Sequence, residues 1–285
     1  MSWETDGWLH LQGVFSPAEI EPVNDLVDRL WSTKPSNVTV DDVNLLQRTR
    51  MSKLMDEQRM HRVKISDLFL DYAEVRDLLL HPRILSVVQP LLGDRPVLCN
   101  SLNLERSSAQ DYHADSLYMT PHTRESLIAS WIALEDVTPG SGPLRLYPGS
   151  HRFAPFVFSN GQRHAITAEM PKWAEHMARE IETRRAEPHV VYAKAGDVVL
   201  WHADLLHGAE AIADATRTRK SLVGHYFSES DCRRMGHRVA GSGSHLWLKR
   251  APQPVDFLSR LRSAVERRIQ RIRGAIRSIR VNSRN

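Results

Sequence analysis

The 285-residue chain contains only two cysteines, Cys99 and Cys232. Two thiols cannot build a disulfide framework or a zinc–thiolate site, so we expect core or surface thiols in a reducing compartment. No apolar run approaches the roughly 18 residues that a membrane-spanning helix needs. Acidic residues such as Glu4 and Asp6 near the start lead us to expect no secretory signal peptide. These absences predict a cytoplasmic protein, although they leave peripheral membrane attachment open.

Several catalytic motifs are also missing. The chain has no phosphate-cradling Gly-x-x-x-x-Gly-Lys, no dinucleotide-binding Gly-x-Gly-x-x-Gly and no Gly-x-Ser-x-Gly nucleophile turn. Nothing in the sequence therefore points to a P-loop nucleotidase, a dinucleotide-dependent dehydrogenase or a serine hydrolase of the common types.

Basic residues outnumber acidic ones only at the C-terminal end of the chain. Residues 260–285 hold nine arginines and one glutamate, a net charge of +8, whereas the other 259 residues hold 29 basic and 33 acidic groups, a net charge of −4. Apolar residues recur in this tail at spacings of three and four, from Leu258 to Ile279, with arginines between them. This pattern predicts an amphipathic helix over residues 257–285, separate from a domain spanning residues 1–256.

Three roles for the predicted helix compete. It packs on the body of the protein or on a second subunit, which we favour, or it lies on an anionic membrane surface. Contact with nucleic acid is the least favoured reading. Arginines on a solvated helix face are common and need no partner at all.

Short strand-like segments dominate the middle of the chain. Ser16-Pro17 with Glu19 marks the start of a helix by a capping box, residues 34–60 read as a loop with short helical pieces, and 67–80, 81–92 and 166–184 read as helical. Several short strands with turns between them favour a β-barrel or sandwich. The expected strands cover residues 9–15, 96–106, 112–115, 127–137, 144–147, 189–193, 198–202 and 221–227.

The chemistry is indicated by His113-Ala114-Asp115, with His207 far downstream. Residues i and i+2 of an extended strand point to the same side, so His113 and Asp115 can bind one metal together. Two histidines and one carboxylate on one face of an octahedral ion are typical of non-haem Fe(II) oxygenases. A second His-x-Asp, at His202 and Asp204, lacks the same downstream context, and we interpret it as a strand end with one packed and one solvated side chain.

Longer sequence blocks around these residues also resemble a known family of proteins. Residues 128–151 and 195–208 (AGDVVLWHADLLHG), the pair His113-x-Asp115 and Arg219-x-Ser221 resemble the phytanoyl-CoA dioxygenase family of Fe(II)/2-oxoglutarate oxygenases. The resemblance runs from about residue 5 to about 228 in the family's order. It implies a mainly β fold, a double-stranded β-helix or jelly roll of the cupin type with peripheral helices.

The resemblance also implies a cosubstrate site. Arg219 would bind the distal carboxylate of 2-oxoglutarate, since a planar guanidinium makes two parallel bonds to a carboxylate. Relatives often place this arginine eleven residues after the distal histidine, where this chain has Thr218. We choose Arg219 over Arg217 because it begins Arg-x-Ser, and Ser221 would add a further bond. Other residues expected near the site are Asn103 for the cosubstrate and Tyr118, Met119 and Trp131 for the substrate pocket.

The favoured hypothesis is an enzyme that uses Fe(II), 2-oxoglutarate and O2 to hydroxylate an unactivated C–H bond of a small molecule, releasing succinate and CO2. Because halogenating relatives have a small residue in place of the carboxylate, Asp115 favours hydroxylation or a related oxidation. The alternative is a non-catalytic metal-binding or interaction protein of the same fold that acts through its basic C-terminal helix. The substrate itself is not indicated, although segments 116–126 and 166–184 are expected to determine it.

Overall fold

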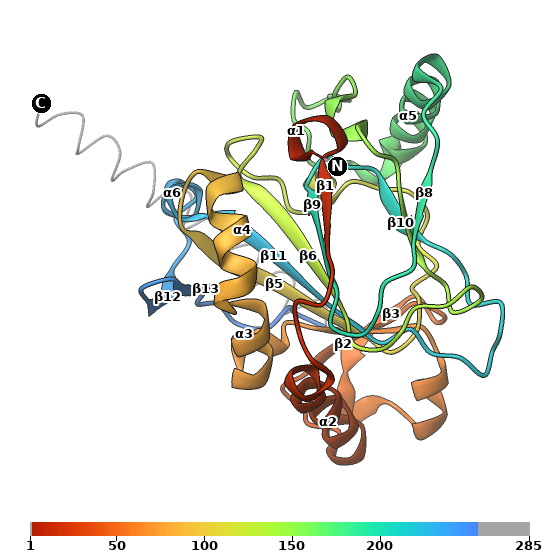
Figure 1. The fold of residues 1–285 in the computed structure, drawn as a ribbon, viewed down its shortest axis with the longest axis vertical. Helices are drawn as coiled ribbons and strands as arrows, with labels where there is room; N and C mark the ends of the chain where they lie inside the picture. Colours follow the sequence, from red (N-terminus) through yellow and green to blue (C-terminus); the bar gives the residue numbers. More distant parts are fainter. Residues whose placement is uncertain (1, 256–285) are drawn as a thin grey trace, which may run out of the picture.

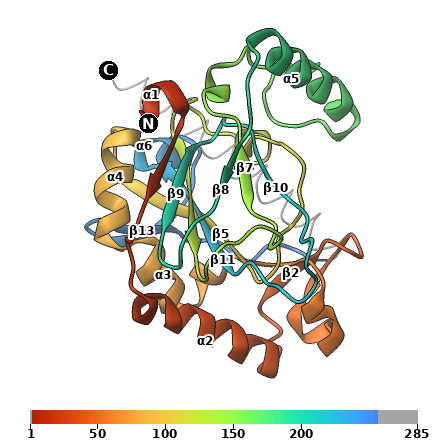
Figure 2. The ribbon, with the colours of Figure 1, turned by 45° about the vertical axis from the view of Figure 1, so that its right-hand side comes forward.

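Two facing β-sheets form the centre of the molecule. The computed structural model describes residues 2–255, so the predicted helix over residues 257–285 lies outside the described residues. The large sheet has the strand order β1-β9-β6-β11-β5-β4-β2-β3, with β13 added beside β5 and β12 beside β13, and the small sheet has the order β10-β7-β8. Figures 1 and 2 show the small sheet on one side of the large one and most helices on the other.

The strands are short, and nearly all pairs are antiparallel. In the large sheet they are β1 (Trp8–Leu11), β2 (Thr39–Asp42), β3 (Gln47–Arg50), β4 (Val63–Ser66), β5 (Pro96–Leu104), β6 (Leu127–Ala133), β9 (Val198–His202), β11 (Ser221–Ser228), β12 (Val239–Ser242) and β13 (His245–Leu248). In the small sheet they are β7 (Leu144–Leu146), β8 (His189–Val191) and β10 (His207–Ala209).

Three helices, α2 (Pro17–Thr33), α3 (Ala73–Leu79) and α4 (Pro82–Leu92), lie along the outer face of the large sheet (Figure 1). The other helices are α1 (Trp3–Asp6), α5 (Met170–Arg184) and α6 (Glu229–Arg234), and α5 packs in a separate cluster with Phe153 and Leu206. The predicted capping box is present at the start of α2, where Glu19 accepts from the backbone and hydroxyl of Ser16.

Each face of the large sheet has its own hydrophobic core. Alternate residues of a strand point to opposite faces, so Leu222 and Tyr226 of β11 pack with the helices whereas Val223 packs toward the small sheet. The inner core joins Trp131 of β6 to Leu144 and Leu146 of the small sheet. Ser221, which was predicted to lie in the cosubstrate site, is on the same side of β11 as Val223.

Three expectations about local structure need correction. Residues 34–60 contain the strands β2 and β3, which extend the large sheet, instead of a loop alone. Segment 112–115 is not a strand, because only His113 forms a β-bridge and Asp115 begins a 3-10 helix. Helix 67–80 is divided into a 3-10 turn, Leu68–Leu70, and α3. The remaining predicted strands and helices are present with shifted ends.

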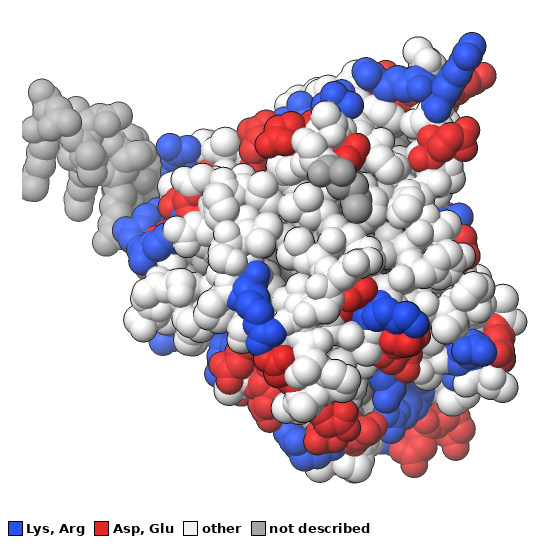
Figure 3. Space-filling model, in the orientation of Figure 1, with Lys and Arg blue, Asp and Glu red and all other residues white. Residues whose placement is uncertain are grey.

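Charges of both signs are mixed on the surface. In the view of Figure 3, Lys, Arg, Asp and Glu gather over α2 at the bottom and α5 at the top, and the middle is mostly uncharged. Within residues 2–255, no helix has the length and apolar character required to span a membrane.

Candidate metal and cosubstrate site

One extended residue is enough to place His113 and Asp115 on the same side. Ala114 between them has φ −118° and ψ 138°, which are extended values. Ala114 and Leu117 pack with Phe153 and Leu206 in a separate hydrophobic cluster. The alternation expected from the His-x-Asp spacing is therefore present without a continuous strand.

His207 reaches the same point from β10 in the small sheet. His113 and His207 exchange two backbone hydrogen bonds, with N···O distances of 2.9 and 3.0 Å. A Cβ atom on Gly208 would lie only 2.8 Å from the backbone oxygen of Gln110. The His-Gly pair in the sequence is thus explained, because glycine permits the close approach that brings the two histidines together.

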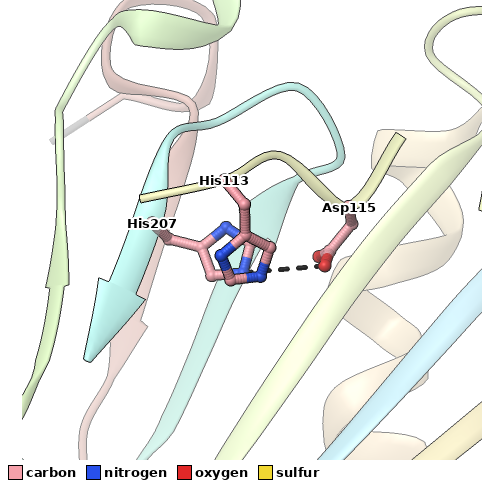
Figure 4. Close-up of side chains that lie close together, drawn as sticks. All are labelled: His113, Asp115 and His207. Atoms are coloured by element: carbon pink, nitrogen blue, oxygen red, sulfur yellow. Dashed lines mark ion pairs between the residues drawn. The ribbon is translucent and has the colours of Figure 1, made fainter. Parts of the chain in front are cut away.

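The three side chains form one cluster. Ligand atoms of His113, Asp115 and His207 all lie within 4.8 Å of one another, the one such group of His, Cys, Asp or Glu found among the described residues. Figure 4 shows the two rings and the carboxylate pointing toward a common centre. Nε2 of His207 lies 3.6 Å from Oδ1 of Asp115.

Hydrogen bonds prepare both imidazoles for a metal. Nδ1 of His113 lies 2.9 Å from the backbone oxygen of Asp111, and Nδ1 of His207 lies 3.0 Å from that of Leu205. A carbonyl oxygen only accepts, so each Nδ1 carries the proton and each Nε2 keeps its lone pair. Donors of this kind, together with one carboxylate, fit Fe(II).

The pKa shifts of His113 and Asp115 are consistent with a neutral imidazole and an anionic carboxylate as metal ligands. Burial, and then the neighbouring His207 ring, lower the pKa of His113 to about 3, so its imidazole is neutral at neutral pH. Burial alone would raise the pKa of Asp115, but the imidazoles of His207 and His225 outweigh it and hold this pKa well below its usual range. At neutral pH the cluster therefore contains a neutral imidazole at His113 and an anionic carboxylate at Asp115.

The second His-x-Asp pair lies outside this cluster. Nδ1 of His202 accepts from the backbone N–H of Asp204 at 3.0 Å, and the His202 ring lies 5.3 Å from that of His151. Asp204 is not solvated as expected, because it pairs with Arg124 at 2.6 Å and Arg163 at 3.4 Å. Its role in the structure is to join two loops.

Arg219 is the arginine that the structure buries. It is 3% exposed, and its guanidinium carbon lies 5.6 Å from the centre of the Trp131 ring. Arg217 is on the surface, where it pairs with Asp214 at 3.1 Å, and the Thr218 hydroxyl donates to Glu135. Burial lowers the pKa of Arg219 to about 10, against the charge of Glu135, so it remains a cation at neutral pH.

Three buried polar groups beside one another have no partner within residues 2–255. They are Nε of Arg219, Oγ of Ser221 and Nε1 of Trp131. Unpaired buried polar atoms are rare because each costs free energy. A carboxylate placed here would satisfy several of them, so the residues present fit a dicarboxylate cosubstrate.

Asn103 does not join this group. It lies opposite Leu222 in the pairing of β5 with β11, and so it points to the outer face of the sheet, whereas Ser221 points inward. Its neighbours there include Asn24 and Val27 of α2. The one-residue alternation of a strand thus removes Asn103 from the expected cosubstrate contacts.

The three residues expected in the substrate pocket lie in different places. Tyr118 is 52% exposed with its ring 6.0 Å from that of His113, so it lies at the rim of the site. Met119 is partly buried against a cluster that includes Phe227. Trp131 is fully enclosed beneath Arg219, and it therefore belongs with the proposed cosubstrate contacts.

Lys64 is an inward-facing residue that sequence reasoning missed. It lies opposite Leu104, which in turn lies opposite Ser221, so all three point to the inner face. Its ammonium donates to Oε1 of Gln110 at 2.7 Å. Burial lowers the pKa of Lys64, the Asp41 and Asp115 charges oppose this, and the Arg219 charge adds to it. The sequence did contain a sign of this position, because Lys64 lies between the apolar residues Val63 and Ile65 in a short strand.

Comparison with known proteins decides the family. The family model for phytanoyl-CoA dioxygenase (PhyH) matches residues 3–220. The chain belongs to the phytanoyl-CoA dioxygenase family. A probable phytanoyl-CoA dioxygenase of Caenorhabditis elegans is 25% identical over 254 residues, with 81% of this chain and 75% of the relative covered. The peroxisomal phytanoyl-CoA dioxygenase of Homo sapiens is 22% identical over 249 residues, covering 81% and 67%.

A solved structure gives the same fold. The 2-oxoglutarate-dependent carbocyclase SnoK of nogalamycin biosynthesis superposes with a TM-score of 0.61 at 21% identity, covering 79% of this chain and 81% of that one. The predicted jelly roll is therefore confirmed. This phytanoyl-CoA dioxygenase family member is a non-haem Fe(II)/2-oxoglutarate-dependent dioxygenase, and the predictions of iron and 2-oxoglutarate are confirmed at the level of the family and of the His–Asp–His cluster.

Proposed function

We propose that His113, Asp115 and His207 hold Fe(II), and that the enzyme hydroxylates an unactivated C–H bond of a small-molecule metabolite. The observation that carries the proposal is the convergence of three ligand atoms within 4.8 Å, with both imidazole protons held by backbone carbonyls. Three protein ligands on one face leave three positions for cosubstrate and oxygen. When bound, iron and 2-oxoglutarate supply the oxidising chemistry, with succinate and CO2 as coproducts.

Arg219 anchors the far carboxylate of 2-oxoglutarate in this proposal. Its guanidinium is buried and cationic, lies against Trp131, and has Ser221 two residues further along the same face. Lys64 adds a second positive charge to the inner face. Two cations near one site match a dianionic cosubstrate, and the buried setting strengthens each charge-assisted bond.

The remaining residues orient and shield. The Trp131 ring fixes the plane of the Arg219 guanidinium, and the apolar residues of the inner core exclude water from one side of the site. Tyr118 lies at the entrance, where a substrate would approach His113, whereas Met119 packs against the cluster that includes Phe227. Segment 116–126, which contains both, is proposed to determine which substrate is accepted.

Product analysis tests the proposal. Purified protein is incubated with Fe(II), 2-oxoglutarate and candidate metabolites under ¹⁸O2, and succinate and oxidised product are followed by mass spectrometry. We expect succinate formation that requires both Fe(II) and 2-oxoglutarate, and a product heavier by one oxygen atom that carries the label. Substrate-dependent succinate with an unlabelled product, such as a ring closure, would replace hydroxylation by another oxidation. No succinate with any substrate, and no metal binding, would favour the non-catalytic alternative.

A further inference from the structure

The carboxylate of Asp115 uses its two oxygens differently. Oδ1 faces His207 at 3.6 Å from Nε2. Oδ2 accepts a hydrogen bond from Nε1 of Trp201 at 2.8 Å and lies 3.3 Å from Nε2 of His225. One oxygen is thus directed at the metal cluster, and the other is held by two side chains that are not among the three candidate ligands.

Trp201 and His225 occupy matching positions on strands β9 and β11, on either side of β6 in the large sheet. Trp201 lies opposite Ala129, and Ala129 lies opposite His225 on the next strand. Side chains opposite one another in antiparallel strands share a face and lie close together. The methyl group of Ala129 leaves space between the two larger side chains, and the Asp115 carboxylate occupies the region that they flank.

The ring of His225 is itself held in place. Nδ1 of His225 lies 3.2 Å from Oδ1 of Asn100, while Nδ2 of Asn100 donates to Oδ1 of Asp67 at 3.2 Å. Asp67 in turn accepts from Arg250 at 2.6 Å. A carboxylate only accepts, so Asn100 must turn its amino group to Asp67 and its oxygen to His225. The two nitrogens of His225 then face Oδ1 of Asn100 and Oδ2 of Asp115, which fixes the orientation of the ring.

The backbone beside His225 is also irregular. The pairing of β11 with β5 passes from His225 opposite Asn100 to Tyr226 opposite Leu98, which leaves Cys99 as an extra residue in a β-bulge. Bulges change the direction of nearby side chains and are frequent beside active sites. Without this bulge, Asn100 and Leu98 would point to the same face, whereas Asn100 points inward and Leu98 packs among the helices.

We propose that Trp201 and His225 are positioning residues that reserve Oδ2 of Asp115, so that only Oδ1 binds the metal. This inference rests on the proposed function, because it takes Asp115 to be a ligand. A carboxylate released from both donors can bind through two oxygens and fill a position needed by cosubstrate or oxygen. Trp201 also contacts a second ligand, since its ring lies 4.7 Å from that of His207.

The test uses Co(II) alone as the probe, with full-length protein. Co(II) reports its coordination through visible absorption, and its affinity is measured by titration without turnover. We expect His225→Leu and Trp201→Phe each to weaken Co(II) binding roughly ten- to hundred-fold, as is usual when partners of metal ligands are removed, and to alter the visible spectrum. His225→Gln keeps an N–H donor and should recover most of the affinity.

Two matched controls separate positioning from packing. Trp8→Phe removes a buried indole N–H that has no partner within the described residues, on the strand that pairs with β9 at Trp201. His202→Leu removes a buried histidine next to Trp201 in sequence. Both should leave Co(II) affinity within about two-fold and the spectrum unchanged.

The outcomes are distinct. Wild-type affinity and spectrum in both Trp201→Phe and His225→Leu, or equal losses in the controls, would overturn the positioning role while leaving the metal ligands intact. An Asp115→Ala variant that binds Co(II) as tightly as wild type would instead contradict the proposed function. If His225→Leu fails to fold, Trp201→Phe and His225→Gln decide the question by the same two readouts.

Discussion

The guanidinium of Arg219 lies over the indole ring of Trp131, 5.6 Å from its centre, in the interior between the two sheets. Replacing Arg219 by alanine removes a charge-assisted contact to the cosubstrate, at a cost of about 2–5 kcal/mol. We therefore expect the 2-oxoglutarate concentration for half-maximal rate to rise roughly thirty-fold or more. Arg219→Lys should recover only part of the loss. Succinate formation at saturating Fe(II) measures both.

Arg217→Ala is the matched control for Arg219. Arg217 is exposed and paired with Asp214, so its removal should change the half-saturating 2-oxoglutarate concentration by less than about two-fold. A crippled Arg217→Ala together with a near-normal Arg219→Ala would reverse the assignment and remove Ser221 with it.

Lys64→Met tests the second cation of the inner face. Methionine is close to lysine in length and flexibility but carries no charge, so packing changes little. Loss of one hydrogen bond to a charged group, about 1.5–3 kcal/mol, should raise the half-saturating 2-oxoglutarate concentration roughly ten- to hundred-fold. Lys53→Met, at an exposed position, serves as the control. Unchanged 2-oxoglutarate dependence in Lys64→Met would restrict the cosubstrate contacts to the Arg219 side.

Asp115→Ala should abolish turnover and weaken Fe(II) binding, because one of three protein ligands is lost. Asp204→Ala, in the second His-x-Asp pair, should keep metal affinity within a few-fold, since Asp204 pairs with Arg124 and Arg163. Anaerobic Fe(II) titration compares them. Loss of iron from Asp204→Ala but not from Asp115→Ala would mean that the wrong pair has been chosen.

Arg250→Ala should destabilise the fold through Asp67. Asp67 is 1% exposed and Arg250 is 29% exposed, and their closest atoms are 2.6 Å apart. A fully buried pair that loses one partner costs about 3–5 kcal/mol, and the partial exposure of Arg250 should reduce this to about 1–2 kcal/mol. Urea unfolding measures the change. Lys249→Ala, its exposed neighbour, should alter the free energy of unfolding by less than about 0.5 kcal/mol, and equal effects of the two would argue against a specific role of the pair.

Deleting residues 257–285 tests the division of the chain. Every residue proposed to touch iron or 2-oxoglutarate precedes this segment, so the shortened chain should form succinate within about two-fold of the full chain. Cosedimentation of both chains with anionic and neutral vesicles measures the membrane role. Loss of turnover in the shortened chain would contradict the predicted boundary, and vesicle binding that survives the deletion would contradict a membrane role for the tail.

The local part of the site could be read from the sequence. His113 and Asp115 share a side because one extended residue separates them, and that spacing holds even though segment 112–115 is not a strand. The same alternation puts Arg219 on the side of Ser221, but it does so for Arg217 as well, so only the structure shows that Arg219 is buried and that Arg217 lies at the surface. Family-specific blocks such as Gly-Asp-Val-Val-Leu-Trp also indicated the jelly roll and its cofactors, since short sequence motifs keep their order along the chain.

Relations between distant strands were decided only by the tertiary structure. Whether Asn103 points inward, whether Lys64 faces Ser221 across Leu104, and which side chains hold Oδ2 of Asp115 all depend on the register of strands far apart in sequence. A shift of one residue turns every side chain of a strand to the other face. The bulge at Cys99 makes such a shift within β5. The sequence by itself therefore determined the chemistry of the metal ligands, whereas strand pairing determined their surroundings.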